Sequence, residues 1–274
     1  MIRKRFSKYP LLGGSILMVA GMASCDNVEP ADRYIELPSV QIARKVLVQE
    51  FTGIKCSNCP TGAMTLSEIQ KANEGSVIAV SMHPSGTTFS GPMGNFNLNS
   101  DEADVYYAAY NPMGFPAILV DGGSPETNIS AWGGLVDAAL ANPAPAEISL
   151  SNTYDSSKRE LTVDYEVVFN SGYSGNLNMN LWLVENGIIG PQLSGSAWIP
   201  QYTHNHALRA SLTGDWGISI GSGFHLDDVR SGSVTYTLPE EYVAENCLVV
   251  AFIQNDSHRV EQCEEAHVIQ HQEE

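Results

Sequence analysis

Residues 45–60 read KVLVQEFTGIKCSNCP, and most of what the sequence says about fold and chemistry follows from them. The apolar, β-branched run at the start of this segment is typical of a buried strand. A short turn follows, and then Cys56 and Cys59 with two residues between them. Pro60 comes next and fits only the first turn of a helix. The segment therefore predicts a strand, a Cys-x-x-Cys turn and a helix whose dipole would stabilise a Cys56 thiolate.

Two further residues point to the same kind of unit. Glu50 lies six positions before Cys56, where a partly buried carboxylate can act as a general base in thiol exchange. Downstream, the segment 114–122 contains a second apolar strand that begins at Pro116. Proline is tolerated as the first residue of a strand. We expect a cis peptide bond before Pro116. Over residues 45–142 these features resemble the thioredoxin-like fold.

This resemblance implies a role for each residue. Cys56 would be the attacking thiol, Cys59 the resolving thiol, Glu50 the buried acid and Pro116 the cis-proline beside the disulfide. The chain departs from the usual pattern in two places. Lys55 replaces an aromatic residue, and Ser57-Asn58 replaces Gly-Pro, which leaves the reduction potential open.

The first 24 residues have the features of a bacterial signal peptide. A basic start precedes an apolar segment that is too short to span a bilayer, and small residues precede Cys25. This is the lipobox pattern, although Met22 stands in place of the commoner leucine. We expect Cys25 to be diacylated, with residues 25–43 as a tether. The alternative is ordinary secretion with Cys25 unmodified.

The composition is that of an acidic, exported protein. The chain has 14 Lys and Arg against 31 Asp and Glu, a net charge of −17. Binding of nucleic acid through charge is therefore excluded. Cys247 and Cys263 could pair in an oxidising compartment. A hairpin centred on residues 255–258 would place Cys247 opposite a residue nearer Ala266, so this pairing is left open.

Residues 61–142 continue the α/β pattern. A helix is predicted at 61–73, followed by a parallel strand at 77–82. The next helix, at 100–110, has Ser100 as its N-cap. The last helix, at 130–142, is expected to turn Leu135, Val136 and Leu140 inward.

Two features could lie near the thiols. His83 follows the 77–82 strand at the edge where α/β proteins place their chemistry, but a histidine there is more often a strand-end residue with a satisfied hydrogen bond. The loop at 85–99, rich in Gly, Ser and Asn, is expected to cover the active-site edge and select substrates.

After a stiff linker at 143–145 the pattern changes to short alternating strands. They are predicted at 147–154, 160–169, 177–185, 232–237 and 248–254, with a glycine-rich turn at 221–223. This spacing predicts an antiparallel β-sandwich.

One motif in this part contains two histidines. On a strand, His204 and His206 would project to the same face, and His225 could supply a third metal ligand. Two histidines without a fixed third ligand are more often loop or surface residues. We therefore predict no metal and no cofactor.

A closer resemblance covers nearly the whole mature chain. The segments that carry it are the lipobox, Phe51-Thr52-Gly53-x-x-Cys56-x-x-Cys59-Pro60, His204-Asn205-His206-x-Leu208-Arg209, Trp216-Gly217 and the run 249–255. Together they are similar to the 28-kilodalton outer-membrane lipoprotein family of Bacteroidota. That family implies an α/β thioredoxin-like domain at 44–142 followed by an all-β immunoglobulin-like sandwich domain at 143–274. It also implies attachment to the outer membrane through a lipid anchor, facing the periplasm or the cell surface.

Two functions remain at this point. The first is thiol–disulfide exchange with protein thiols or disulfides, carried out by Cys56, Cys59 and Glu50. The second is a non-catalytic surface adhesin whose Cys56–Cys59 disulfide is structural and whose β domain binds a glycan or a protein. Glu50 and Pro116 favour the first, because a structural disulfide requires neither.

Overall fold

The computed structural model describes residues 42–269. The predicted signal peptide at 1–24, the lipidation at Cys25 and nearly all of the tether lie outside the described residues. The described residues belong to one compact unit. None of their helices is long and apolar enough to cross a membrane.

The first part of the unit consists of three strands of a larger sheet, together with helices. Its elements are β1 (Val46–Phe51), α1 (Cys59–Ala72), β2 (Val77–Met82), α2 (Asp101–Tyr110), β3 (Ala117–Val120), the 3₁₀ helix η2 (Ile129–Ala131) and α3 (Trp132–Leu140). β1 pairs in parallel with β2 and antiparallel with β3. Every residue of β1 is buried, because both faces of this sheet are covered. That is why the strand is almost uninterrupted in its apolar sequence.

Several local predictions are confirmed here. Ser100 caps α2, its hydroxyl accepting a hydrogen bond from Ala103 N at 3.2 Å, and the Phe115–Pro116 peptide bond is cis. The inward face predicted for the last helix is wrong at Leu135, which is 40% exposed. α3 starts only at Trp132, so Trp132 and Val136, four residues apart, form the buried face instead.

The second part consists of strands. They are β4 (Ala146–Asp155), β5 (Glu160–Phe169), β6 (Tyr173–Glu185), β7 (Ile188–Ser194), β8 (Ala197–His204), β9 (Ala207–Ser211), β10 (Ile218–Phe224), β11 (Val229–Thr237), β12 (Cys247–Asn255) and β13 (Val260–His267), with the 3₁₀ helix η3 (Ala244–Asn246). The turn predicted at 221–223 lies inside β10. Its glycines lie where the register against β6 shifts. They therefore form β-bulges within the strand and do not reverse the chain.

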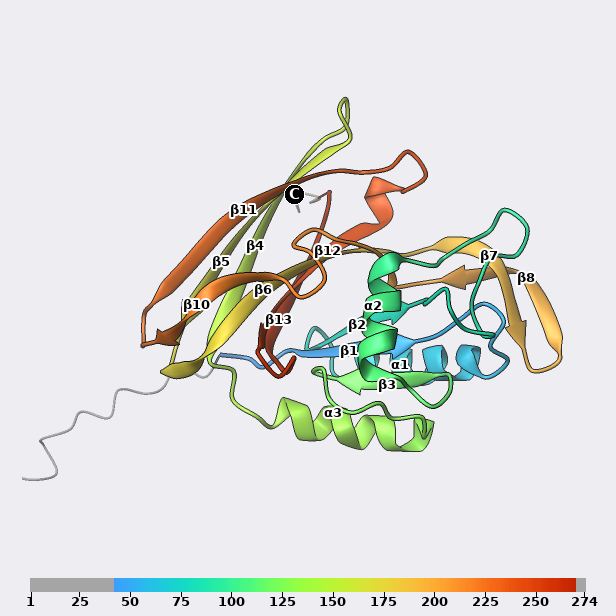
Figure 1. Cartoon of the computed structure of the whole chain (residues 1–274), viewed down its shortest axis with the longest axis horizontal. Helices are drawn as coiled ribbons and strands as arrows, with labels where there is room; N and C mark the ends of the chain where they lie inside the picture. The colour runs from blue at the N-terminus through green and yellow to red at the C-terminus, as the bar shows by residue number, and fades with distance from the viewer. Residues whose placement is uncertain (1–41, 270–274) are drawn as a thin grey trace, which may run out of the picture. The chain divides into compact units, whose positions relative to one another are not determined.

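One sheet runs through both parts of the unit (Figure 1). Its strand order is β13-β12-β6-β9-β2-β1-β3, and β10 also pairs with β6. The parts join where β2 pairs with β9 at Ser81 and Ala207, and Ser81 N donates to His206 O at 2.7 Å. The domain boundary predicted between residues 142 and 143 therefore separates β1, β2 and β3 from later strands that belong to the same sheet.

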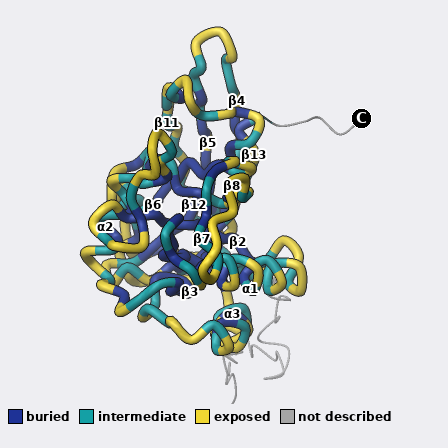
Figure 2. The backbone as a smooth tube through the Cα atoms, turned by 90° about the vertical axis from the view of Figure 1, so that its right-hand side faces the viewer, coloured by how far each residue is buried: buried dark blue, intermediate teal, exposed yellow. Residues whose placement is uncertain are grey.

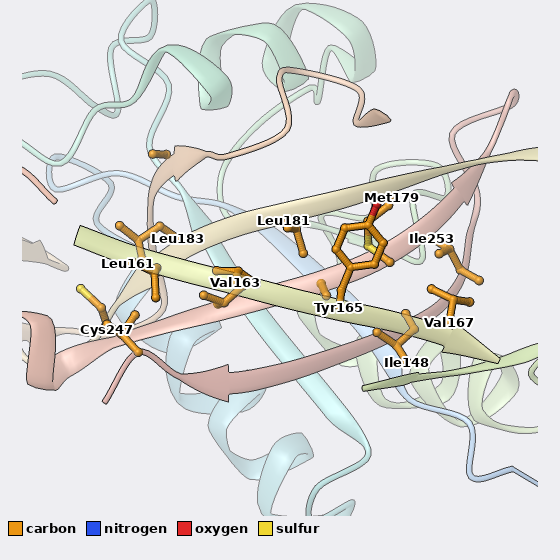
Figure 3. Packing of buried hydrophobic residues seen from close by; sticks show 14 of the residues in the cluster. Ile148, Leu161, Val163, Tyr165, Val167, Met179, Leu181, Leu183, Cys247 and Ile253 are labelled. Atoms are coloured by element: carbon orange, nitrogen blue, oxygen red, sulfur yellow. The ribbon is translucent and has the colours of Figure 1, made fainter. Parts of the chain in front are cut away.

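A second sheet, of order β11-β5-β4, packs on this one. Figure 3 shows Leu161, Val163 and Tyr165 of β5 among side chains of β6 and β12. Two sheets thus face each other, as predicted for a sandwich. The structure supports a mixed α/β part followed by β-strands, while the immunoglobulin-like type stays a prediction.

The two remaining cysteines are free and buried. β12 and β13 pair so that Cys263 lies opposite Phe252, and Val268 N donates to Cys247 O at 2.9 Å. Cys247 packs in the core between the two sheets, and Cys263 in the core beneath α2. The hairpin register therefore keeps the two thiols apart, and the pairing left open by the sequence does not form.

Candidate functional site

The Cys-x-x-Cys turn connects β1 to α1, and Cys56 and Cys59 are joined by a disulfide. The helix begins at Cys59, two residues earlier than predicted, and Cys56 precedes its first residue by three positions. Cys56 lies in the preceding turn, where its N–H donates to Gly53 O at 3.0 Å. A Cβ added at Gly62 would come within 2.8 Å of Pro116 Cγ. α1 therefore packs directly against the cis-proline.

Both cysteines are only 2% exposed, and the loop at 85–99 is one of the segments that cover them. Lys55 N donates to Phe89 O at 2.9 Å, and Ser90 Oγ donates to Thr52 O at 3.1 Å. A Cβ at Gly53 would lie 2.2 Å from Phe89 O, so the close approach of this loop requires glycine there. The loop lies over the edge that the sequence predicted for it.

The other cover is the β7–β8 hairpin, which the sequence did not predict (Figure 1). Its backbone binds the cysteine turn: Leu193 N donates to Ile54 O at 2.8 Å, and Gly195 N donates to Ser57 O at 2.9 Å. Figure 2 shows β8 largely exposed on the outer side of this hairpin. A strand pair from the second part of the chain thus closes the site of the first part.

Gln192 fixes the hairpin to the turn. This side chain is 3% exposed, and its Nε2 donates to Gly53 O at 3.2 Å and to Cys56 O at 3.1 Å. The amide therefore gives each of these buried carbonyls a second hydrogen bond beside its backbone one.

We expect Gln192→Ala to make the disulfide more accessible. The two carbonyls keep their backbone donors, Cys56 N and Cys59 N, so the variant loses two buried hydrogen bonds of about 0.5–1.5 kcal/mol each. Reduction of Cys56–Cys59 by dithiothreitol, followed by trapping of free thiols, should become about tenfold faster, since about 1.4 kcal/mol corresponds to a factor of ten. Gln201→Ala, on the exposed side of β8, is the matched control. Equal rates in the two variants would contradict the role of Gln192.

Glu50 lies behind the disulfide at the end of β1. It is 1% exposed and lines a cavity of about 30 Å³ together with Cys59, Ser81, His83, Tyr202 and His204. Ser81 Oγ donates to Glu50 Oε2 at 3.3 Å. Burial raises the pKa of Glu50 to about 8, and the Ser81 hydrogen bond opposes this only in part. At neutral pH the group is therefore a carboxylic acid beside Cys59, able to donate a proton.

Two histidines complete this cavity. His83 and His204 are 4% and 5% exposed, and their rings are 6.2 Å apart in an edge-on arrangement. Burial lowers the pKa of His83 to about 3 and that of His204 to about 4. Both imidazoles are therefore neutral at physiological pH.

The metal geometry considered for His204, His206 and His225 does not form. β8 ends at His204, and His206 lies in the connection to β9 with φ of +59°, so the two are not on one strand face. His225 is exposed beside Asp228. Within residues 42–269 no three His, Cys, Asp or Glu side chains are placed to hold a metal.

Sequence reasoning missed Gln192, Ser81 and Tyr202 as parts of this site. Among the cavity residues on the β7–β8 hairpin, only His204 carried a signal, through the His-Asn-His motif. The motif marks the place where the hairpin leaves the sheet, since Gly187 N donates to Asn205 Oδ1 and His206 N donates to Asn186 Oδ1.

A wider groove lies on the outer side of the turn. Its volume is about 410 Å³, and it is lined by Asn58, Thr61, Met113, Gly114, Phe115, Pro116, Thr127 and Ile129. Met113 is 99% exposed. This groove offers an apolar surface beside the cis-proline.

Solved structures share this fold at low sequence identity. HBP35 of Porphyromonas gingivalis is 15% identical, with 83% of this chain and 76% of that chain covered at a TM-score of 0.65. A protein of Agrobacterium tumefaciens is 16% identical, with coverages of 85% and 99% and a TM-score of 0.50. At these identities the likeness shows the fold alone. No curated protein matches the chain.

The sequence itself matches a described family. The family named Outer membrane protein Omp28 matches residues 103–272, well over half of the chain. A domain of the outer membrane lipoprotein Omp28 from P. gingivalis is also similar, at 18% identity, with coverages of 46% and 88% and a TM-score of 0.34. The match of the family model confirms the family resemblance seen in the sequence. The chain belongs to the Omp28 family and is an outer membrane protein.

Proposed function

We propose that this protein is a lipid-anchored, thioredoxin-like protein of the outer membrane that exchanges disulfides with protein thiols through Cys56 and Cys59. The observation that carries the proposal is the buried Glu50 carboxyl in the same cavity as Cys59. Its pKa of about 8 makes it a proton donor to a leaving thiolate and, once ionised, an acceptor from the thiol. A purely structural disulfide would not need this group.

The reaction divides the roles between the two cysteines. A substrate thiolate attacks Cys56 Sγ, the bond between the two cysteine sulfurs breaks, and the electron pair goes to Cys59 Sγ. Glu50 gives its proton to Cys59. A second substrate thiolate then attacks the substrate sulfur of the mixed disulfide and releases Cys56 as a thiolate. The same steps in reverse start from the Cys56 thiolate and the Cys59 thiol and reduce a substrate disulfide.

The groove beside Pro116 supports a polypeptide substrate. An extended segment lying along Met113 and Phe115 would bring a substrate sulfur toward the cysteine turn. The cover over Cys56 must open for this contact, because the sulfur is otherwise shielded. Anchoring through acylated Cys25 is supported by the small residues before it and by the family, and two acyl chains suffice to hold a protein at a membrane.

One observation favours a second function. Both cysteines are 2% exposed beneath the hairpin, as expected for a structural disulfide. β8 also presents Trp198 and Ile199, which are 43% and 37% exposed. In this alternative the protein is a surface adhesin that binds a protein or a glycan.

The reduction potential decides between the two functions. The full chain is equilibrated in glutathione buffers and its free thiols are trapped. A value of about −120 to −270 mV is expected for exchange, whereas a value below about −300 mV indicates a resistant structural bond.

We expect Cys56→Ser to abolish exchange with a protein disulfide, because no attacking thiol remains. Cys59→Ser should instead accumulate a mixed disulfide at Cys56, since the resolving thiol is missing. Mass spectrometry of the trapped species identifies the sulfur involved. Ser57→Ala keeps both thiols and serves as the control. Exchange that persists in Cys56→Ser would contradict the mechanism.

A further inference from the structure

Three residues that line the cavity behind the disulfide each have a buried polar atom without a hydrogen-bond partner. These atoms are Glu50 Oε1, His83 Nδ1 and His204 Nε2, and their residues line the same cavity of about 30 Å³. An unpaired buried polar atom costs about 1–3 kcal/mol. The cavity is also large enough for one water molecule, which needs two to four polar partners. Three such atoms at one place indicate a role beyond packing.

The proton transfer from Glu50 requires a route by which the buried carboxylate regains a proton. Each time Cys59 leaves as a thiolate and takes the Glu50 proton, the carboxylate must be protonated again. Glu50 is 1% exposed, so solvent does not reach it directly. The groups around it are Cys59 from α1, Ser81 and His83 from the end of β2, and Tyr202 and His204 from β8.

The cavity that holds Glu50 and the two histidines is also lined by the exposed Asn205. His83 follows β2 directly, and His204 ends β8 next to the exposed Asn205. The ring of His204 lies 4.9 Å from that of the half-buried Tyr202 and 5.5 Å from that of Phe96. A neutral imidazole can accept a proton at one nitrogen and release one from the other.

We propose that His83 and His204 carry the proton that Glu50 exchanges with solvent. The inference rests on the proposed function and extends it, because it assigns the β7–β8 hairpin a part in the reaction through His204. Arg209 on β9 is a positive charge that lowers the pKa of His83. It therefore disfavours a protonated His83. The pair therefore passes protons through neutral imidazoles.

The proton and electron balance is as follows for a dithiol substrate. Two substrate S–H protons go to solvent, and two electrons pass to the Cys56–Cys59 bond while the substrate sulfurs form a disulfide. Cys56 takes a proton from solvent, and Cys59 takes one from Glu50. The proton returned to Glu50 enters through His204 and His83, so the protein ends with two thiols and a protonated carboxyl.

The test uses the full chain in detergent with dithiothreitol as the reductant. His83→Phe and His204→Phe are compared with His225→Phe, which replaces an exposed histidine away from the site. We expect steady-state turnover between dithiothreitol and oxidised glutathione at pH 7 to be at least tenfold slower in the first two variants, because each cycle after the first requires Glu50 to exchange its proton with solvent. The equilibrium constant against glutathione should change less than twofold. A relay changes the rate alone, whereas a structural defect changes both.

A second readout does not depend on thiol exchange. Infrared difference spectroscopy follows the carboxylic acid band of Glu50, identified by its loss in Glu50→Gln, after a pH jump from 7 to 9. We expect deprotonation to be at least tenfold slower in His83→Phe and His204→Phe. If the wild type shows no exchange with dithiothreitol, the proposed function fails, and this readout still tests the relay. If exchange is normal but the band decays at the wild-type rate in both variants, the relay alone is overturned.

Discussion

Glu50→Gln should remove most of the pH dependence of stability between pH 6.5 and 8. The pKa of Glu50 is raised from 4.5 to about 8 in the folded protein, chiefly by burial. Between these values the folded state holds a proton that the unfolded state has lost. The free energy of unfolding therefore falls as the pH rises, by about 1.4 kcal/mol for each pH unit.

The histidines act in the opposite direction at lower pH. The folded pKa values of His83 and His204, about 3 and about 4, lie below their usual value. These residues add stability as the pH rises toward 6.5. Above pH 6.5 the contribution of Glu50 remains, so the wild type should lose about 2 kcal/mol relative to Glu50→Gln between pH 6.5 and 8.

Urea unfolding at pH 6, 6.5, 7, 7.5 and 8 measures this difference. The comparison isolates Glu50, because the histidines titrate in both proteins. Glu68→Gln, which changes an exposed carboxylate on α1, should run parallel to the wild type. If Glu50→Gln and the wild type also run parallel, the buried carboxyl does not hold its proton and the acid role assigned to Glu50 fails.

The parts of the site that the sequence predicted are those encoded by local chemistry. A β-branched run, two cysteines and a proline fix the order of β1, the turn and α1 without help from distant residues. The cis-proline and the Ser100 N-cap are equally local. Each depends on the conformational limits of one residue and its neighbours.

The cover over the disulfide could not be predicted in this way. Gln192 lies 136 residues from Cys56 along the chain, and nothing near it signals that its amide will meet Gly53 O. β8 has few buried positions, so it lacks the alternation that identifies a strand. The pairing of β2 with β9 likewise rests on one residue pair. The Gln192 hydrogen bonds, the β7–β8 hairpin and the β2–β9 pairing all depend on tertiary contacts between segments that are far apart in the sequence.

Trp182→Ala should destabilise both parts of the chain together. Trp182 is fully buried on β6, with its ring 5.0 Å from that of Tyr106 on α2 and 4.7 Å from that of Phe252 on β12. The same core contains Leu47 and Ile78 of β1 and β2. Truncation of such a side chain costs about 3–5 kcal/mol. Because the core joins α2 to strands of both parts, we expect a single unfolding transition that shifts as a whole.

The two free thiols report on this cooperativity separately. Cys263 belongs to the core around Trp182, whereas Cys247 belongs to the core between the two sheets. Their labelling by a thiol reagent at increasing urea should show the same midpoint, in the wild type and in Trp182→Ala. Trp198→Ala removes a tryptophan that is 43% exposed, so it should change stability by less than about 0.5 kcal/mol. Separate midpoints for Cys263 and Cys247 would mean that the core around Trp182 and the core between the two sheets unfold independently. A common midpoint would mean that the shared sheet makes the two cores one folding unit. The hairpin that covers Cys56 would then be stabilised by the free energy of folding of the entire unit.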